Sequence, residues 1–378
     1  MGKSCLRPFI CFGTRPEAIK LAPVIHECIK HEQISPVVCS TGQHKEMLDQ
    51  ASDYFELAID FKLNVMKHNQ TLASLTTTLL DGLNEKIIQT KPDCIIAQGD
   101  TTTVLAAAMT AFYNRLPFCH VEAGLRTYNL QSPWPEEFNR RVAGLCTSLH
   151  FAPTARAASA LSREGISREN IFVTGNTVID ALKWARKKEL AHSAVWTKKY
   201  EFLGDSTVIL ITGHRRENFG DGFQSIFKAI KKLADAFPKF KFVFPVHLNP
   251  NVQKPVADVL GQLNNVHLIP PTPYPEFIWL MDRSYLIITD SGGVQEEGPS
   301  FRVPIIVTRD TTERPEAVEA GAVVLVGTNE EKLFEVAQKL LTNKEYYLSH
   351  TVDENPYGDG TASSQIIQIL LDRFLAPT

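Results

Sequence analysis

The chain has 378 residues, more than the roughly 100–200 of one domain, so its length predicts two domains. Apolar residues make up 44% of the chain and charged residues 21%, which excludes a disordered or membrane-embedded protein, and a net charge of −3 excludes a general field for nucleic acid. Seven cysteines without CxxC spacing, mostly in apolar stretches, predict buried reduced thiols in a cytoplasmic protein.

Short apolar runs alternate with longer helical patterns along the whole chain. We expect strands within residues 8–13, 35–41, 92–98, 117–122, 149–153, 206–213, 240–246, 265–270, 284–290, 303–309 and 322–327. Helical patterns such as 222–237 and 275–284 lie between the later runs. Near-continuous apolar strands that alternate with helices predict two parallel sheets of the α/β class, each covered by helices on both faces.

The division between the two sheets is expected near the polar stretch that follows "VTGNTVIDALKW". We expect a first Rossmann-like domain over 1–176 and a second over 177–362. The last segment, 363–378, is amphipathic and is expected to pack back on the first domain as a helix.

Ligands of open α/β sheets bind at the carboxyl ends of the strands, so the residues just after each strand are the candidates for a site. The first strand is followed by "GTRPEAIK", which places Arg15 at the mouth of a helix and Lys20 about one turn further in. The stretch lacks GxGxxG, which argues against a nicotinamide cofactor. An alternative is that Arg15 pairs with a carboxylate and Lys20 is solvated.

Three later loops of the first half each place a carboxylate after a strand: Asp100, Glu122 and Glu136. Asp100 alone could be a helix cap. Three converging carboxylates shift one another's pKa, which suits acid and base chemistry on a neutral substrate. We expect Glu137 and Arg141 to form only an i,i+4 surface pair.

Basic residues occupy the corresponding positions of the second half. His214 and Arg215 follow its first strand, and His247 follows its second. A lone histidine at a strand end is as often structural as functional. No HExxH or Cys/His cluster supports a metal site.

The stretch "TDSGGVQEEGPS" predicts a nucleotide site. Ser291, Gly292 and Gly293 open a helix whose N-terminus favours phosphate. Of the two glutamates one turn further in, Glu297 is preferred over Glu296 as an acceptor for vicinal sugar hydroxyls.

Aromatic and basic residues flank that stretch. Tyr274 and Phe277 offer a platform for a flat base, although a core-facing aromatic is the commoner role at such positions. Arg314 follows another strand. These residues together predict a nucleotide on the second domain, with a reacting group turned towards the carboxylates of the first.

Nine motifs in this order resemble the non-hydrolysing UDP-N-acetylglucosamine 2-epimerases: "GTRPEAIKLAPV", "TGQH", "QGDTTT", "HVEAGLRTYN", "SPWPEEFNRR", "VTGNTVIDAL", "GHRREN", "PVHLNPNV" and "DSGGVQEE…RDTTERPEA". The resemblance runs from Gly13 to about Gly327. It implies the GT-B architecture, with two Rossmann-like domains facing a cleft, a homodimer, and no metal or nicotinamide. It also implies reversible conversion of UDP-GlcNAc to UDP-ManNAc for surface polysaccharide synthesis, by anti elimination of UDP to 2-acetamidoglucal and syn re-addition.

The resemblance assigns a role to each candidate residue. It implies catalytic carboxylates at Asp100, Glu122 and Glu136, phosphate-side groups at Arg15, Lys20, the catalytic His214, Ser291, Gly292 and Gly293, uracil contact at Phe277, ribose contact at Glu297, and a further diphosphate contact at Arg314. Three other functions remain open. They are a hydrolysing epimerase that releases ManNAc and UDP, a GT-B glycosyltransferase, and a non-catalytic sensor of nucleotide sugars.

Members of the family often need a second UDP-GlcNAc as activator, and a regulatory site for it is implied here. Gln43, Arg215 and His247 match its pattern, but Glu46 stands where a neutral amide is expected and Asn69 where an arginine is expected. An added acid and a lost arginine both weaken diphosphate binding. The sequence therefore predicts a weaker or different dependence on that activator. The alternative is that Lys45 or Lys67 restores the lost charge.

Overall fold

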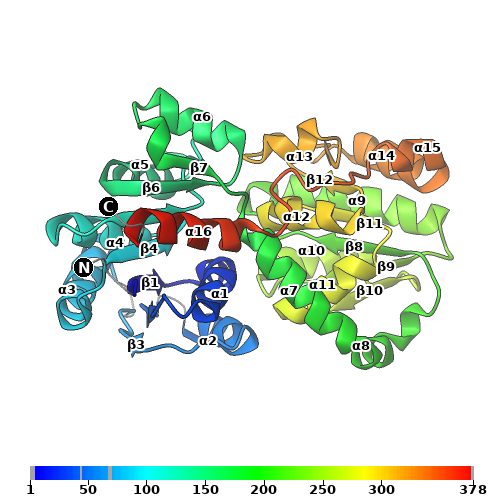
Figure 1. Cartoon of the computed structure of the whole chain (residues 1–378). Coiled ribbons are helices and arrows are strands. Elements are labelled where there is room, and N and C mark those ends of the chain that lie inside the picture. Colours follow the sequence, from blue (N-terminus) through cyan, green and yellow to red (C-terminus); the bar gives the residue numbers. More distant parts are fainter. Residues whose placement is uncertain (1–4, 43–44, 67–69, 376–378) are drawn as a thin grey trace. The chain divides into compact units, whose positions relative to one another are not determined.

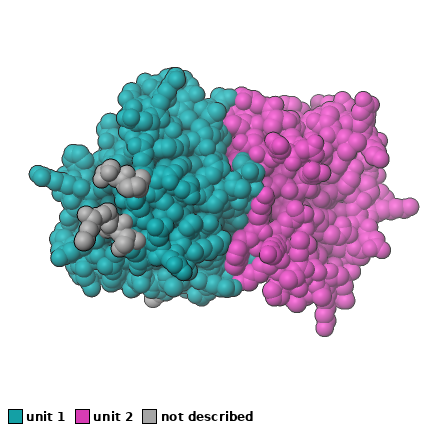
Figure 2. All heavy atoms as spheres, in the orientation of Figure 1, with its two compact units in different colours: residues 1–181, 358–378 teal, residues 182–357 magenta. Residues whose placement is uncertain are grey.

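The protein consists of two α/β units, seen in a computed structural model that describes residues 5–42, 45–66 and 70–375 (Figure 1). One compact unit is formed by residues 1–181 together with 358–378, and the other by residues 182–357 (Figure 2). We call these unit 1 and unit 2. The expected divisions, after residues 176 and 362, lie close to these two points. The first division falls within helix α7 (Thr177–Ala191).

Unit 1 is built on a seven-stranded parallel sheet with the order β3-β2-β1-β4-β5-β6-β7. Its strands are β1 (Pro8–Phe12), β2 (Val37–Ser40), β3 (Phe61–Lys62), β4 (Cys94–Gln98), β5 (Phe118–Val121), β6 (Thr147–Ala152) and β7 (Ile171–Val173). The five strands expected in this half are present, and their apolar runs fit a sheet covered on both faces. The two short edge strands, β3 and β7, were not predicted.

Helices connect these strands (Figure 1). They are α1 (Arg15–Lys30), α2 (Lys45–Tyr54), α3 (Leu72–Thr90), α4 (Thr102–Tyr113), α5 (Glu136–Cys146), α6 (Ala155–Arg163) and the C-terminal α16 (Ala362–Phe374). Helix α16 packs against α1. The buried Asp180 carboxylate accepts hydrogen bonds from the Ser363 backbone N–H (2.8 Å) and hydroxyl (2.6 Å), which holds the first turn of α16.

One glycine of unit 1 is required by both conformation and space. Gly124, after β5, has φ +93°, and a Cβ there would lie 2.3 Å from the carbonyl oxygen of Ala157 in α6. None of the seven cysteines forms a disulfide, five of them are buried, and burial raises the pKa of the Cys39 thiol to about 12. The prediction of mostly buried thiols outside disulfides is therefore confirmed.

Unit 2 repeats the architecture with a six-stranded parallel sheet in the order β10-β9-β8-β11-β12-β13. Its strands are β8 (Val208–Thr212), β9 (Lys241–Pro245), β10 (Val266–Ile269), β11 (Leu286–Thr289), β12 (Ile305–Val307) and β13 (Val323–Leu325). Its helices after α7 are α8 (Ser193–Lys199), α9 (Asp221–Ala236), α10 (Pro250–Leu260), α11 (Tyr274–Arg283), α12 (Gly292–Glu297), α13 (Pro315–Glu319), α14 (Glu330–Thr342) and α15 (Lys344–Leu348).

Both sheets reverse their strand order at one place, between β1 and β4 in unit 1 and between β8 and β11 in unit 2. Ligands of such sheets bind outside the carboxyl ends of the strands at this switch point. The predicted fold class, two Rossmann-like parallel sheets, is confirmed. In the described residues no helix is long and apolar enough to cross a lipid bilayer.

Candidate active site

The loops after β1 and β4 meet at the switch point of unit 1 through a buried carboxyl group. Glu17 Oε2 accepts from the backbone N–H groups of Gly13 (3.1 Å) and Thr14 (2.7 Å), and Oε1 accepts from the Thr101 hydroxyl (2.7 Å). Burial raises the pKa of Glu17 to about 7, against the lowering effect of these hydrogen bonds. Glu17 therefore joins the two loops that carry Arg15 and Asp100. Sequence reasoning missed this residue.

Lys20 of α1 is buried and forms an ion pair with Glu122. Its Nζ lies 2.5 Å from Glu122 Oε2, which also accepts from Gln98 Nε2 at 2.9 Å. The alternative that Lys20 is solvated is therefore wrong. Arg15, the first residue of α1, is exposed.

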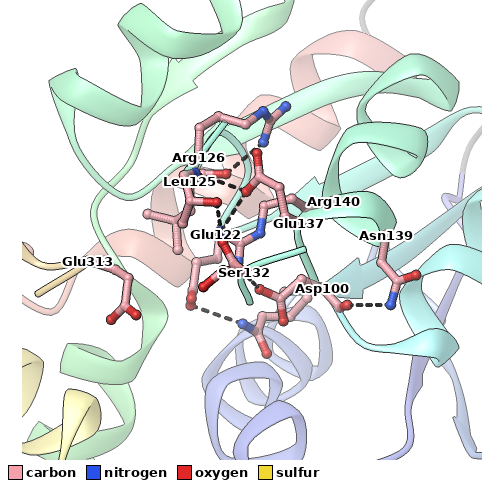
Figure 3. Close-up of polar contacts among 12 residues, drawn as sticks. Asp100, Glu122, Leu125, Arg126, Ser132, Glu137, Asn139, Arg140 and Glu313 are labelled. Carbon is pink, nitrogen blue, oxygen red and sulfur yellow. Dashed lines mark hydrogen bonds and ion pairs between the residues drawn. The ribbon is translucent and has the colours of Figure 1, made fainter. Parts of the chain in front are cut away.

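The first turn of α5 holds Asp100 in place (Figure 3). Asn139 Nδ2 donates to the Asp100 backbone carbonyl (2.9 Å), and Arg140 Nη2 donates to the Asp100 carboxylate (2.5 Å). Glu136 is the first residue of the same helix and is half-buried. The N-cap of α4 is Thr101, so the interpretation of Asp100 as a helix cap is wrong.

Glu137 is completely buried, which corrects the expectation of a surface pair with Arg141. Its carboxylate accepts from the backbone N–H groups of Thr127 (2.9 Å) and Tyr128 (3.0 Å), and from Arg140 Nη1 at 3.3 Å (Figure 3). Two residues of the loop before α5 thus bind this side chain directly. Glu137 therefore shapes the loop that leads to Glu136.

A buried histidine supports the Asp100 loop from β5. The ring Nε2 of His120 lies 2.7 Å from the Gly99 carbonyl oxygen, and 1% of the residue is exposed. Burial lowers the pKa of His120 to about 4, so its ring is neutral at physiological pH.

A buried aspartate organises the loop after β8 in unit 2. Asp290 Oδ2 accepts from the backbone N–H groups of His214 (2.9 Å) and Arg215 (2.8 Å), and Asp290 Oδ1 lies 3.4 Å from His214 Nδ1. The His214 ring stacks on His247 with ring centroids 5.7 Å apart. Asp290 was not predicted, although an acid directly after a central strand is a usable signal.

The glycines of α12 make room for an arginine. A Cβ on Gly292 would lie 2.7 Å from Arg314 Cζ, so the guanidinium of Arg314 lies directly over this glycine. Arg314 Nε is 2.8 Å from Glu296 Oε1. Ser291 is the N-cap of the helix. The predicted phosphate cradle and the predicted diphosphate ligand are therefore neighbours.

The two glutamates of α12 have different partners. Glu296 pairs with Arg314, whereas Glu297 Oε1 accepts from the Tyr274 hydroxyl at 2.6 Å. Phe277, one turn along α11 from Tyr274, is half-buried.

Part of the predicted regulatory site lies outside the described residues. This applies to Gln43 and to Asn69. Glu46, in the first turn of α2, is exposed. In the part of the chain that the structure describes, no group of three or more His, Cys, Asp or Glu side chains is placed to hold a metal ion.

Comparison with known proteins identifies relatives of nearly the whole chain. The family model described as UDP-N-acetylglucosamine 2-epimerase matches residues 26–371. The UDP-N-acetylglucosamine 2-epimerases of Neisseria meningitidis serogroup A and Escherichia coli K12 are 50% and 48% identical to it; each match covers 95% of this chain and, respectively, 98% and 96% of the relative.

Two solved structures are similar as well. The UDP-GlcNAc 2-epimerase from Neisseria meningitidis bound to UDP-GlcNAc has a TM-score of 0.90 and 49% identity, over 97% of this chain and 100% of that one. The S. aureus MnaA–UDP structure has a TM-score of 0.87 and 39% identity, over 97% of this chain and 96% of that one. The chain belongs to the UDP-N-acetylglucosamine 2-epimerase family.

Proposed function

We propose that this protein is a non-hydrolysing UDP-N-acetylglucosamine 2-epimerase, an isomerase that interconverts UDP-GlcNAc and UDP-ManNAc. One observation carries the proposal: a chain about 50% identical to curated epimerases over nearly its whole length has Asp100 and Glu122 just after neighbouring strands and Glu136 at the start of the helix that holds Asp100. The names of its relatives describe the same activity, and two related structures contain UDP-GlcNAc or UDP.

The chemistry requires proton transfer at a carbon that is not acidic. Direct inversion at C2 of the sugar would need a poor carbanion, whereas anti elimination of UDP gives the neutral 2-acetamidoglucal, and syn re-addition of UDP gives the other epimer. Carboxylates that move the C2 proton suit this route. Asp100 and Glu122 are held for it by Arg140 and Lys20.

The leaving UDP needs positive charge and backbone donors on the other side of the reaction. We assign the diphosphate to Ser291, Gly292, Gly293, Arg314 and His214, with Arg15 and Lys20 as further phosphate-side groups. Glu297, held by the Tyr274 hydroxyl, is assigned to the ribose, and Phe277 to the uracil. Glu296 is already paired with Arg314, which favours Glu297 for the sugar.

Proton NMR of UDP-GlcNAc incubated with the protein in D₂O tests the proposal. We expect UDP-ManNAc to form, deuterium to enter C2 of both epimers, and small amounts of 2-acetamidoglucal and UDP to accumulate. Accumulation of free ManNAc would identify a hydrolysing epimerase. Sugar transfer to an acceptor without epimerisation would identify a glycosyltransferase, and no reaction would leave a sensor. Epimerisation without exchange would contradict the elimination mechanism.

We also propose a homodimer formed through unit 1. Helices α3, α4 and α5 pack side by side, and near their C-terminal ends they expose Ile88, Phe112, Tyr113 and Leu145, the last with 82% of its surface accessible. Large apolar residues gathered on adjacent helices are typical of an interface. Light scattering should give a dimer mass for the wild type and a monomer mass for Leu145→Glu. A monomeric wild type would contradict the proposal.

Reduced substrate activation remains a proposal for the same enzyme. Arg215 and His247 lie on the loops after β8 and β9, and the acid Glu46 is exposed at the start of α2. With UDP-ManNAc as the only substrate, we expect turnover without a lag. A long lag abolished by trace UDP-GlcNAc would indicate a regulatory site that functions with Glu46 and Asn69.

The cellular location and pathway are also proposals. Mostly buried thiols outside disulfides fit a cytoplasmic enzyme, which would supply ManNAc units for a surface polysaccharide.

A further inference from the structure

The backbone on both sides of Asp100 is fixed by side chains from other elements. The peptide group that joins Gly99 to Asp100 has its carbonyl oxygen 2.7 Å from His120 Nε2. The next peptide group, which joins Asp100 to Thr101, has its carbonyl oxygen 2.9 Å from Asn139 Nδ2. With both flanking peptide planes held, φ and ψ of Asp100 are fixed, and with them the direction in which its side chain leaves the backbone.

Gly99 is the position where this loop would otherwise change direction most easily. Its φ is +87°, and no atom lies within 4 Å of the place where a Cβ would be, so surrounding packing does not restrain it. Its N–H donates to the Val121 carbonyl (3.1 Å) and its C=O accepts from the His120 ring. Strand β5 therefore holds both polar groups of this glycine.

The tautomer of His120 follows from its surroundings. Burial lowers its pKa to about 4, so the ring carries one N–H at neutral pH. A carbonyl oxygen accepts but does not donate, so we assign that proton to Nε2. In the described residues Nδ1 has no hydrogen-bond partner, as expected for the nitrogen that carries the lone pair.

We propose that His120 is a positioning residue for the reaction: its Nε2–H fixes the Gly99 peptide and thereby the orientation of the Asp100 carboxylate. The inference rests on the proposed function, in which Asp100 moves a proton. Loss of the bond allows the peptide before Asp100 to rotate, while Asn139 and Arg140 still hold the Asp100 carbonyl and carboxylate. A catalytic group misplaced by about 1 Å can lose on the order of 100-fold in rate, so the expected loss is in kcat.

Two amide variants distinguish the effect of the hydrogen bond from the effect of a smaller side chain. The Gln amide nitrogen lies the same number of bonds from Cβ as His Nε2, whereas the Asn nitrogen stops at the depth of Nδ1. We expect His120→Gln to keep kcat within about 3-fold of wild type, and His120→Asn to lose about 10–100-fold in kcat with KM changed less than about 3-fold.

His150 provides the matched control. It is the register partner of His120 on β6, it is fully buried, and its ring makes no hydrogen bond to residues 99–101 in the described part of the chain. His150→Asn should lower the melting temperature by about as much as His120→Asn and keep kcat. If His120→Asn does not fold, His120→Phe, which keeps the ring volume without the donor, takes its place with the same expectation.

The outcomes separate this inference from the proposed function. A wild-type protein without epimerase activity refutes the proposed function itself. An active wild type with equal kcat in His120→Gln and His120→Asn refutes only the role of His120. An equal loss of kcat in His150→Asn refutes it too, because the effect would then follow from a destabilised sheet.

Discussion

Units 1 and 2 share one strand order, but some candidate residues at the same edge are held by partners of opposite charge sign. In unit 1 a cation holds a carboxylate: Arg140 is 10% exposed and its partner Asp100 28%. In unit 2 a buried carboxylate holds a more exposed basic side chain: Asp290 is 0% exposed and its partner His214 47%. Arg314 and Glu296 follow the unit 2 pattern, with 21% against 3%. Among these candidate residues the more exposed partner is thus the acid in unit 1 and the basic side chain in unit 2, whereas Arg309 of unit 2 is 6% exposed beside the more exposed Glu217 and Glu313.

The Lys20–Glu122 pair departs from this pattern. Its two side chains are 11% and 7% exposed, so neither is clearly the accessible partner. In a pair buried this deeply, the attraction between the two charges is opposed by the free-energy cost of removing both from water. The comparison shows that the same strand order accommodates exposed side chains of either charge at its carboxyl edge. The buried partner of each pair determines which charge is exposed there.

The largest effect should come from removing the acids of unit 1. Asp100→Asn, Glu122→Gln and Glu136→Gln are each expected to lower kcat by roughly 10²–10⁴-fold, because they remove a proton-transfer group. The affinity for UDP, measured by calorimetry, should change little. Glu297→Ala in unit 2 should do the reverse and weaken UDP binding first. Glu136→Gln with wild-type kcat would exclude a proton-transfer role for Glu136.

Stability should respond next, at a glycine of unit 1. Gly124→Ala is expected to destabilise the fold by roughly 2–4 kcal/mol, because its Cβ meets a backbone carbonyl and its φ is positive. Gly220 of unit 2 has φ +79° and ψ −125° and open space around its Cβ position, so Gly220→Ala should cost only the backbone strain, roughly 1–3 kcal/mol. Urea unfolding of both variants checks this, and equal costs would mean that the Ala157 contact relaxes freely.

Glu17 predicts a pH dependence that belongs to unit 1. Its pKa in the folded protein is about 7, above the ordinary value of 4.5, so the stability it contributes is fully present below about pH 4.5 and is lost as the pH rises through 7. Glu17→Gln cannot ionise. Its free energy of unfolding relative to wild type should therefore rise by roughly 3 kcal/mol between pH 4.5 and pH 8. Parallel stability curves for variant and wild type would contradict the raised pKa.

The smallest effect is expected at the cradle of unit 2. Gly292→Ala should displace Arg314 from Glu296 and weaken UDP binding about 10-fold, or about 1.4 kcal/mol. In an Arg314→Ala background the same change should have almost no effect, because the clashing atoms are gone. A full 10-fold loss of UDP affinity in that background would mean that the added methyl group clashes with the ligand rather than with Arg314.

The sequence was most informative about the strands and about the loop residues that follow them at the carboxyl edge of each sheet. All eleven expected strands are present. They could be predicted because their apolar runs are long enough to recognise, whereas β3 and β7, at the ends of the sheet, have only two and three residues. Loop residues after strands were identified as candidates from the geometry of parallel sheets alone. A short edge strand leaves too few residues for a pattern to form.

The partners of the candidate residues could not be read in the same way. Arg140 lies 40 positions from Asp100, and His120 lies 21 positions from Gly99. No local pattern encodes contacts at such separations, because they depend on the strand order and on the turns between elements. Glu137 was misjudged for a related reason: its helical spacing is that of a surface pair, and only the loop above it makes it buried.

The C-terminal helix α16 has a consequence for the order of events during synthesis. Residues 358–378 belong to unit 1, and Asp180 binds the start of α16 across 183 positions of sequence. Unit 2 is one continuous segment, made after residues 1–181 and before the last helix of unit 1. Because contiguous domains fold as they emerge, the segment that began synthesis first is the last to be completed. A ribosome stalled before residue 358 therefore holds a unit 1 that still lacks its last helix.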